Sequence, residues 1–258
     1  MMNRRTFSTV VAAGLTTSAL GLGSRTVASA APIQNVVLVH GLYADGSCWT
    51  EVIRLLQAKG LKATAVQNPL RTFDGDVATA RYTLGLQDGP TVLVAHSFGG
   101  MIVTEAGIHP NVSSLVYIAA RAPDAGENYP ALAKQYPTPP ASAGLVISGD
   151  LEQLNQNAFM NDFANGVDPA RARELYAVQA PNAVSLPATA KTTVAAWRSK
   201  PSWYAVSKQD RTINPDLERF MAKRMKATTI EIDAGHLSLI SHANEVANLI
   251  LAAAGQHS

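Results

Sequence analysis

The chain has 258 residues, of which 47% are hydrophobic and 16% are charged, and its formal net charge is +2. This length fits one domain with an insertion, because single hydrophobic cores reach roughly 250 residues. The sequence has no basic run or basic patch interleaved with aromatic residues, so binding to nucleic acid is not expected. A single cysteine, Cys48, excludes an internal disulfide, and we expect it to pack beside Trp49.

Residues 1–30 have the pattern of an export signal. Arg4 and Arg5 form a basic start that is typical of the twin-arginine type, a weakly apolar stretch covers 10–22, and an Ala-Ser-Ala site closes the segment. This stretch is too short and too rich in Gly, Ser and Thr to span a bilayer of ~30 Å, so no stable membrane anchor is expected. We expect a mature chain that begins near Ala31, has a net charge of −1, and works in the periplasm or outside the cell.

Six short apolar runs alternate with helical patterns along the rest of the chain. The expected strands are residues 36–39, 63–67, 92–95, 115–119, 203–206 and 229–232. The expected helices are residues 49–60, 76–86, 101–108 and 243–254. Because strands and helices alternate, the sequence predicts an α/β fold with a mostly parallel, six-stranded sheet that helices cover on both faces.

The alternation breaks between residues 123 and 199, a stretch rich in Pro, Asn, Gln and Ala with helical patterns at 151–163 and 169–179. Inserted after the fourth strand, this stretch is expected to form a small cap over the carboxyl edge of the sheet, where ligands bind in open α/β sheets. The core would comprise residues 31–122 and 200–258. A disordered linker is the alternative, and the regularly spaced apolar residues of the stretch argue against it.

The most specific motif is Ala-His-Ser-Phe-Gly-Gly at 95–100, which follows a buried strand and precedes a helix. It matches the nucleophile elbow small-x-Ser-x-small, with Ala95 where a glycine usually stands. So tight a turn strains the serine backbone and lifts the Ser97 hydroxyl out of the sheet. The N–H of Phe98, at the helix N-terminus, could stabilise an oxyanion. The motif alone also fits an ordinary serine in a Gly-rich turn, so its partners must be found.

Two later strands end in an acid and an imidazole at the same edge of the sheet. Asp210 follows the fifth expected strand, and His236 follows the sixth. In the chain order Ser97, Asp210, His236, the histidine would take and return the serine proton, and the aspartate would orient the ring and stabilise the imidazolium. Asp124, just past the fourth strand, is the alternative acid, whereas Asp233 stands too close to His236 in the sequence.

The first strand ends in His40-Gly41, which leaves a loop whose backbone can approach Ser97 closely. The N–H of Leu42 would then be the second oxyanion donor, beside that of Phe98. We expect His40 to orient this loop and not to act as a base. The joint presence of elbow, His-Gly loop, strand-end aspartate and Gly-His is far more specific than any one of these motifs.

Over residues 33–254 the chain resembles the α/β-hydrolases. It is most similar in pattern to the small esterases that include plant methylesterases and hydroxynitrile lyases, with bacterial carboxylesterases among their relatives. The resemblance implies a six-stranded core, a small cap, and neither a metal nor an organic cofactor. Hydroxynitrile lyases of this fold carry threonine and lysine where this chain has Gly41 and Leu237, so ester hydrolysis is expected.

The expected function is hydrolysis of small to medium uncharged carboxylic esters through an acyl-enzyme on Ser97. A small-molecule ester is the expected partner, and the sequence leaves the identity of the ester and the oligomeric state open. A lactonase, an amidase or a carbon–carbon hydrolase would use the same triad, and a slowly reacting ligand-binding protein is the alternative outside enzymes. The expected substrate-binding residues are Tyr43, Tyr129, Leu132, Phe159, Met160, Phe163 and Leu237.

Overall fold

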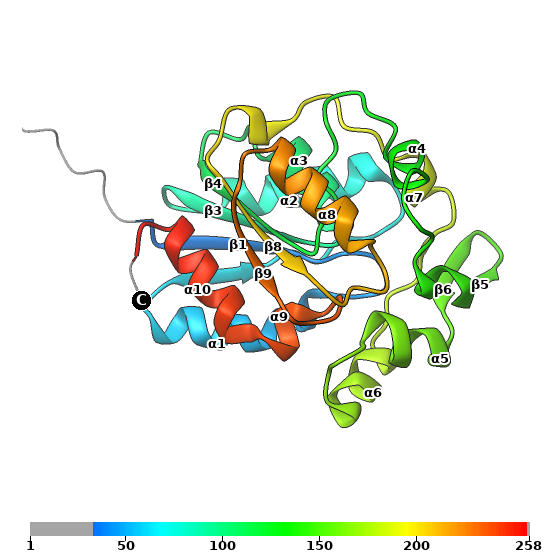
Figure 1. Cartoon of the computed structure of the whole chain (residues 1–258). Coiled ribbons are helices and arrows are strands. Elements are labelled where there is room, and N and C mark those ends of the chain that lie inside the picture. The colour runs from blue at the N-terminus through cyan, green and yellow to red at the C-terminus, as the bar shows by residue number, and fades with distance from the viewer. Residues whose placement is uncertain (1–32, 257–258) are drawn as a thin grey trace, which may run out of the picture. The chain divides into compact units, whose positions relative to one another are not determined.

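The computed structural model of the chain describes residues 33–256 (Figure 1). The expected export signal over 1–30 lies outside the described residues and stays a prediction. Within 33–256, no helix is both long and apolar enough to cross a membrane.

A six-stranded sheet with the strand order β2-β1-β3-β4-β8-β9 forms the centre of the described part. Every pair of neighbouring strands is parallel, which confirms the predicted sheet. Its strands are β1 (Asn35–Val39), β2 (Lys62–Ala65), β3 (Thr91–His96), β4 (Val112–Ile118), β8 (Ser202–Ser207) and β9 (Thr228–Ile232).

The core has two halves, one on each face of this sheet. Successive side chains of a strand point to opposite faces, so Val37 and Val39 of β1 belong to one apolar cluster, whereas Val36 and Leu38 belong to the other. Helices cover both faces, as predicted (Figure 1). The first cluster packs under α2 (Phe73–Gly85), α3 (Gly99–Ala106) and α8 (Pro215–Arg224), and the second under α1 (Thr50–Ala58) and α10 (Ala243–Ala253).

Helix α8 connects β8 to β9 and was not among the helices that periodicity predicted. Its start nevertheless has a recognisable signal, because Asn214 caps the helix by accepting a hydrogen bond from the N–H of Asp216, and Pro215 follows as the first helical residue. The short 3₁₀ helix η1 (Gly46–Trp49) precedes α1, and the short helix α9 (Ser238–Ser241) precedes α10.

Between β4 and β8 the chain forms a group of short elements with a second, antiparallel sheet of order β5-β6-β7. The labelled elements of this insertion, β5, β6 and α4 to α7, gather at one side of the main sheet (Figure 1). Its assignment as a cap domain over 123–199 stays a prediction. The elements are α4 (Tyr129–Ala133), β5 (Leu145–Ser148), β6 (Leu151–Leu154), α5 (Gln156–Ala158), the π-helix η3 (Phe159–Phe163), α6 (Pro169–Ala177), β7 (Asn182–Ala183) and α7 (Leu186–Thr189), with 3₁₀ turns at Pro140–Gly144 and Ala196–Arg198.

One of the two helices expected in the insertion is wrong over its first part. Residues 151–154 form β6, which pairs with β5 across a two-residue turn at Gly149 and Asp150. The glycine has a φ of +64°, a conformation that suits this tight turn, and helical conformation begins only after Asn155. The other expected helix is confirmed as α6, and Asp168 caps it by accepting from the N–H groups of Ala170 and Arg171.

Candidate active site

Ser97 lies in the turn between β3 and α3, and its backbone has a φ of +55°. Residues other than glycine seldom adopt this left-handed conformation, and here the neighbouring strand end holds it. The N–H of Ser97 donates to the carbonyl of Ile118 at 3.3 Å, and the N–H of Arg121 donates to the carbonyl of Ser97 at 3.0 Å. The side chain is almost completely buried. This is the local geometry that the elbow motif predicts.

Backbone segments approach the turn so closely that three positions require glycine. A Cβ at Gly99 would lie 2.6 Å from the carbonyl oxygen of Val39, and one at Gly100 would lie 1.9 Å from that of Arg121. A Cβ at Gly41 would lie 2.5 Å from the Cβ of Ser97. Real Cβ atoms are essentially never found so close to other heavy atoms. The methyl group of Ala95, in contrast, is accommodated in the buried strand.

The loops after β8 and β9 bring Asp210 and His236 together. Nδ1 of His236 lies 2.6 Å from Oδ2 of Asp210, and neither side chain has exposed surface. The other carboxylate oxygen, Oδ1, accepts from the N–H of Thr212 at 2.6 Å and from that of Ile213 at 2.8 Å. Because a carboxylate only accepts, Nδ1 carries a proton in this pair, and Nε2 is free to act as a base.

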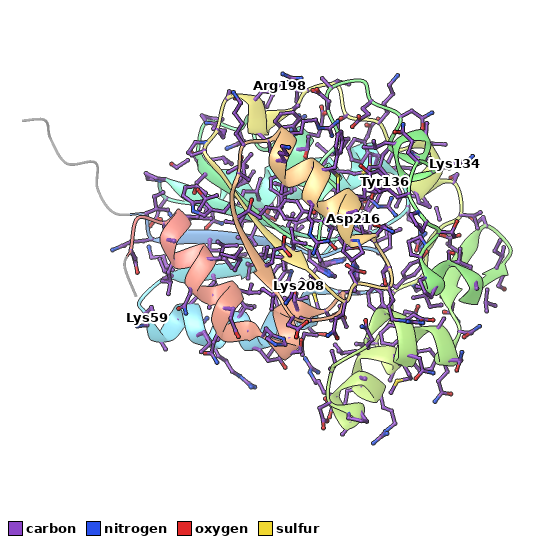
Figure 2. All side chains as sticks on the ribbon, in the orientation of Figure 1. Lys59, Lys134, Tyr136, Arg198, Lys208 and Asp216 are labelled. Atoms are coloured by element: carbon purple, nitrogen blue, oxygen red, sulfur yellow. The ribbon has the colours of Figure 1, made fainter. Side chains whose placement is uncertain are left out.

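The alternative acids are engaged elsewhere. Asp124 forms an ion pair with Arg198, which Figure 2 shows at the outside of the molecule. Asp233 accepts a hydrogen bond from Gln209 at 3.0 Å and lies 3.6 Å from the amino group of Lys208. Of the three aspartates that follow strands at this edge, Asp210 is the one that contacts the imidazole of His236.

The imidazole of His236 lies against the residue that precedes the predicted nucleophile. Its ring centroid is 4.6 Å from that of His96, and Nε2 of His96 donates to the backbone carbonyl of His236 at 3.0 Å. Nε2 of His236 is buried and has no hydrogen-bond partner among the described residues, so no bond joins it to the Ser97 hydroxyl. In the free form of an enzyme such bonds are often long and tighten when substrate binds. Burial, together with the neighbouring imidazole of His236, holds the pKa of His96 well below its ordinary value.

The two expected oxyanion donors also lie at this edge. Within residues 33–256 the backbone N–H groups of Leu42 and Phe98 make no hydrogen bond, although both residues are buried. His40 supports the first loop: its Nε2 accepts from the N–H of Asn68 at 3.0 Å, and its Nδ1 donates to the carbonyl of Gly41 at 2.9 Å. Both ring nitrogens are thus used, and burial lowers the pKa of His40, as suits a neutral structural residue.

Tyr43 connects the first loop to the insertion. Its backbone has a φ of +59°, and its hydroxyl donates to Oε1 of Glu152 in β6 at 3.1 Å. The same oxygen accepts from the side-chain amide of Asn182 in β7 at 2.9 Å. Burial, with the charge of Glu152, raises the pKa of Tyr43, so the phenol keeps its proton and remains a donor. No local pattern could have predicted this buried carboxylate, because its partners lie 30 and 109 residues away in the chain.

A narrow apolar pocket, with a cavity volume of only about 10 Å³, brings together four of the expected substrate-binding residues, namely Tyr43, Phe159, Phe163 and Leu237. The ring of Phe163 lies 5.2 Å from that of His236 and 6.1 Å from that of Tyr43, so the pocket adjoins the imidazole. Cys48 also lines this pocket, and its burial raises the pKa of the thiol.

The other expected substrate-binding residues lie outside that lining. Tyr129 and Leu132 belong to α4 and to the apolar cluster that contains Phe98. Arg121, which sequence reasoning missed, lies between them and the elbow, with its guanidinium carbon 4.8 Å from the Tyr129 ring and 5.3 Å from the Phe98 ring. Met160 is half-buried and packs against the opposite cluster.

The insertion also contacts the loop after β8 on both sides of the aspartate. Asp162 pairs with Arg211 at 2.6 Å, and the side-chain amide of Asn165 donates to the carbonyl of Gln209 at 2.9 Å. These contacts fix the loop that presents the carboxylate to the imidazole. In residues 33–256, no group of three or more His, Cys, Asp or Glu side chains is placed to hold a metal ion.

The model of the alpha/beta hydrolase family matches residues 36–249, and the chain belongs to this family. Esterase PIR7B of Oryza sativa subsp. japonica is 25% identical over 264 residues, which cover 87% of this chain and 97% of that protein. Methylesterase 7 of Arabidopsis thaliana is 33% identical over 104 residues, which cover 34% of this chain and 40% of that protein.

Among solved structures, that of polyneuridine aldehyde esterase has a TM-score of 0.73 at 19% identity, and the match covers 85% of this chain and 98% of that chain. This likeness shows the predicted fold. With the family and its esterase relatives, it identifies the chain as a carboxylic ester hydrolase that resembles the methylesterase group.

Proposed function

We propose that the protein hydrolyses esters by two acyl transfers with Ser97 as the nucleophile. Nε2 of His236 takes the Ser97 proton as Oγ forms a bond to the ester carbonyl carbon. The N–H groups of Leu42 and Phe98 hold the resulting oxyanion. The tetrahedral intermediate then collapses: the bond to the alcohol oxygen breaks, and His236 gives its proton to the leaving alcohol.

The second transfer releases the acid. Water loses a proton to His236 and attacks the acyl-enzyme, and the proton then returns to Ser97 as the serine leaves. Asp210 keeps the imidazole in the tautomer that this cycle needs and stabilises it while it is charged. The observation that carries the proposal is the buried contact of 2.6 Å between Asp210 and His236, beside a serine in a strained turn.

The substrates we propose are small to medium uncharged esters. The pocket beside His236 is lined mostly by apolar side chains such as Phe159 and Phe163, and Asp45 is its one charged lining residue, so an anionic group there would lose its hydration without a partner. Leu237, directly after the histidine, also leaves no cation to bind a cyanide leaving group at that position. This missing cation favours ester hydrolysis over cyanohydrin cleavage.

The test is hydrolysis of p-nitrophenyl acetate and butyrate by the wild type and by Ser97→Ala. We expect steady-state turnover by the wild type and a loss of at least about 10³-fold in the variant, because it lacks the nucleophile. Ser142→Ala is the matched control, since this serine is exposed and donates only to the carbonyl of Pro139. Equal rates in wild type and S97A would contradict the mechanism. A single burst of product without steady-state turnover would instead favour a ligand-binding protein.

We also propose that the protein is exported. The proposal rests on the basic start, apolar stretch and Ala-Ser-Ala site of residues 1–30, which lie outside the described part of the chain. Expression of the full chain in a bacterium that has both export routes, followed by fractionation, tests it. The esterase is expected outside the cytoplasm, and replacing Arg4 and Arg5 with lysine should retain it inside if the twin-arginine route is used. Cytoplasmic wild-type protein of full length would contradict export.

A further inference from the structure

A second carboxyl group lies behind the Asp210–His236 pair. Glu218 stands in the first turn of α8, and its side chain is completely buried. Its Oε2 accepts from the N–H of Ser207 at 3.0 Å, whereas Oε1 has no hydrogen-bond partner within the described residues. Burying an ionised carboxylate that has a single donor is very costly. The proposed mechanism does not use this group, so its protonation state and its purpose need an explanation.

Glu218 is built into the framework that positions both members of the pair. Ser207, to which it binds, accepts from the N–H of Asp210 at 3.1 Å through its carbonyl. The hydroxyl of Ser207 also lies 3.0 Å from that of Ser238, two residues after His236. The carboxyl groups of Glu218 and Asp210 are themselves close enough to share a hydrogen bond once one of them carries a proton.

Two buried carboxyl groups in contact cannot both be ionised, so one of them holds a proton. The donors decide which one. Asp210 accepts from the N–H groups of Thr212 and Ile213 and from Nδ1 of His236, all of which stabilise its ionised form. Glu218 accepts from one backbone N–H only. The proton therefore belongs on Glu218.

We propose that Glu218 is a positioning residue, whose protonated carboxyl donates a hydrogen bond to the carboxylate of Asp210 and thereby holds Asp210 and His236 in their reactive arrangement. The proposal rests on the proposed function of that pair. It extends the triad by a fourth side chain that touches neither substrate nor serine. Asp210 then accepts four hydrogen bonds, which fix its plane and keep it ionised through the cycle.

The surroundings of Glu218 agree with a neutral side chain. Burial raises its pKa well above the ordinary value, and the charge of Asp210 and the hydrogen bond with it act in the same direction. Two tyrosines and one arginine are also near enough to interact with it electrostatically. Burial raises the pKa of Tyr204 well above its ordinary value and that of Tyr129 to about 12, so both are neutral at working pH. Arg219 opposes the shift but is half exposed and pairs with Glu231 and Asp216.

Two substitutions test whether Glu218 acts as a neutral hydrogen-bond donor or as a negative charge. Glu218→Gln keeps the size and supplies a neutral N–H donor, so we expect kcat within about threefold of the wild type and an unchanged pH–rate profile. Glu218→Leu removes the donor, and we expect kcat to fall about 10- to 100-fold, as for the loss of a hydrogen bond to a charged group, with little change in KM. Glu245→Gln is the matched control, because Glu245 is an exposed glutamate in the first turn of α10.

The pH dependence of kcat/KM distinguishes a protonated Glu218 from an ionised one. Without the donor, the charge of Asp210 acts on His236 undiminished, so the acidic limb of kcat/KM for E218L should move to higher pH. If Glu218 were ionised, E218Q would remove a negative charge and move that limb to lower pH. A shift to lower pH in E218Q, or an unchanged kcat in E218L, would overturn the proposal.

An infrared measurement keeps the test independent of activity and of the folding of E218L. The difference spectrum between wild type and E218Q at neutral pH should contain the carbonyl band of a protonated carboxyl group in the wild type, and E245Q should show only the loss of carboxylate bands. Loss of carboxylate bands in E218Q would refute the proposal even in an active enzyme. Conversely, inactivity of the wild type towards every ester would refute the proposed function but leave this band in place.

Discussion

Ser97 is enclosed by backbone from two neighbouring strands, and this crowding sets its geometry. The carbonyl of Ile118 and the N–H of Arg121, on either side of the end of β4, bind the two backbone groups of the serine. On the other side, the loop after β1 comes within contact of the serine side chain at Gly41. The left-handed conformation of Ser97 therefore depends on residues far away in the chain as well as on the glycines that follow it.

Gly41→Ala tests this crowding. The new Cβ would lie 2.5 Å from the Cβ of Ser97 and 3.0 Å from its Oγ, so the serine or the oxyanion loop must move. Because a displacement of about 1 Å at a reacting atom can cost 10²-fold, we expect kcat for p-nitrophenyl esters to fall about 100-fold. Gly89→Ala is the control, since its new Cβ would meet nothing closer than 3.9 Å. A kcat for G41A within twofold of the wild type would show that the contact does not position the nucleophile.

The candidate catalytic residues belong to recognisable sequence motifs, so their roles could be predicted. The residues that position them belong to no motif, so theirs could not. Ser97, Asp210 and His236 follow strands in a recognisable order, and the structure brings the last two into contact. Glu218 looks like any acid in the first turn of a helix, where it would stabilise the helix dipole at the surface. His96 bonds to the backbone of a residue 140 positions away, a contact that no local pattern encodes.

At the scale of elements, the sheet was easier to predict than the insertion. Buried parallel strands contain short continuous apolar runs, and each central strand here contains one, such as β3, in which all residues are buried. The insertion has short elements in which the spacing of apolar residues fits either a helix or a strand. Over 151–163, Leu151, Leu154, Phe159 and Phe163 stand at helical spacing, yet the pairing of β6 with β5 and β7 makes the first four residues a strand.

The return of the insertion to the core depends on one buried carboxylate of α3. Glu105 accepts from the N–H groups of Thr193 at 2.7 Å and Val194 at 3.2 Å, and from the Thr193 hydroxyl at 2.8 Å. In Glu105→Gln an amide replaces one acceptor oxygen and faces these donors. We expect the free energy of unfolding to fall by about 2 kcal/mol in urea titrations, the size of lost hydrogen bonds to a charged group.

Glu174→Gln provides the comparison for this substitution. Glu174 is exposed on α6 and makes an ion pair only with Arg171, so a change below about 0.5 kcal/mol is expected. If E105Q and E174Q unfolded at the same urea concentration as the wild type, the hydrogen bonds of Glu105 to Thr193 and Val194 would not contribute to stability.

For the whole molecule, the direction and order of the strands explain why the candidate catalytic residues lie at one edge of the sheet. All six strands are parallel, so the loops that follow them emerge at the same edge. Because β1 and β3 are direct neighbours, the loops that carry Leu42 and Phe98 lie side by side. Because β8 and β9 are neighbours, Asp210 and His236 meet. The sequence predicted the strands and their direction, whereas their order is set by packing over the whole chain.

The stability of the whole molecule should depend on pH through a buried acid that is not part of the proposed triad. Asp76, in the first turn of α2, is completely buried, and its Oδ1 accepts from the N–H of Leu70 at 2.8 Å. This bond holds Leu70 at a φ of +55°. Oδ2 has no hydrogen-bond partner among the described residues, and burial raises the pKa of Asp76 to about 6. At neutral pH the fold therefore contains an ionised carboxylate, and burial makes this ionised form less favourable in the folded protein than in the unfolded chain.

Asp76→Asn removes this titration while keeping an acceptor for Leu70. In the unfolded chain Asp76 loses its proton near 3.8, but in the folded protein it does so near 6, so the folded state binds more protons between these values. Acidification from pH 7 to about 4 should then favour folding of the wild type relative to D76N. The difference in unfolding free energy between the two proteins should change by about 2.4 kcal/mol over that range. Urea titrations at several pH values measure it, with Asp74→Asn, an exposed acid of the same helical turn, expected to follow the wild-type curve. Parallel pH curves for D76N and the wild type would mean that Asp76 ionises as readily in the folded protein as in the unfolded chain.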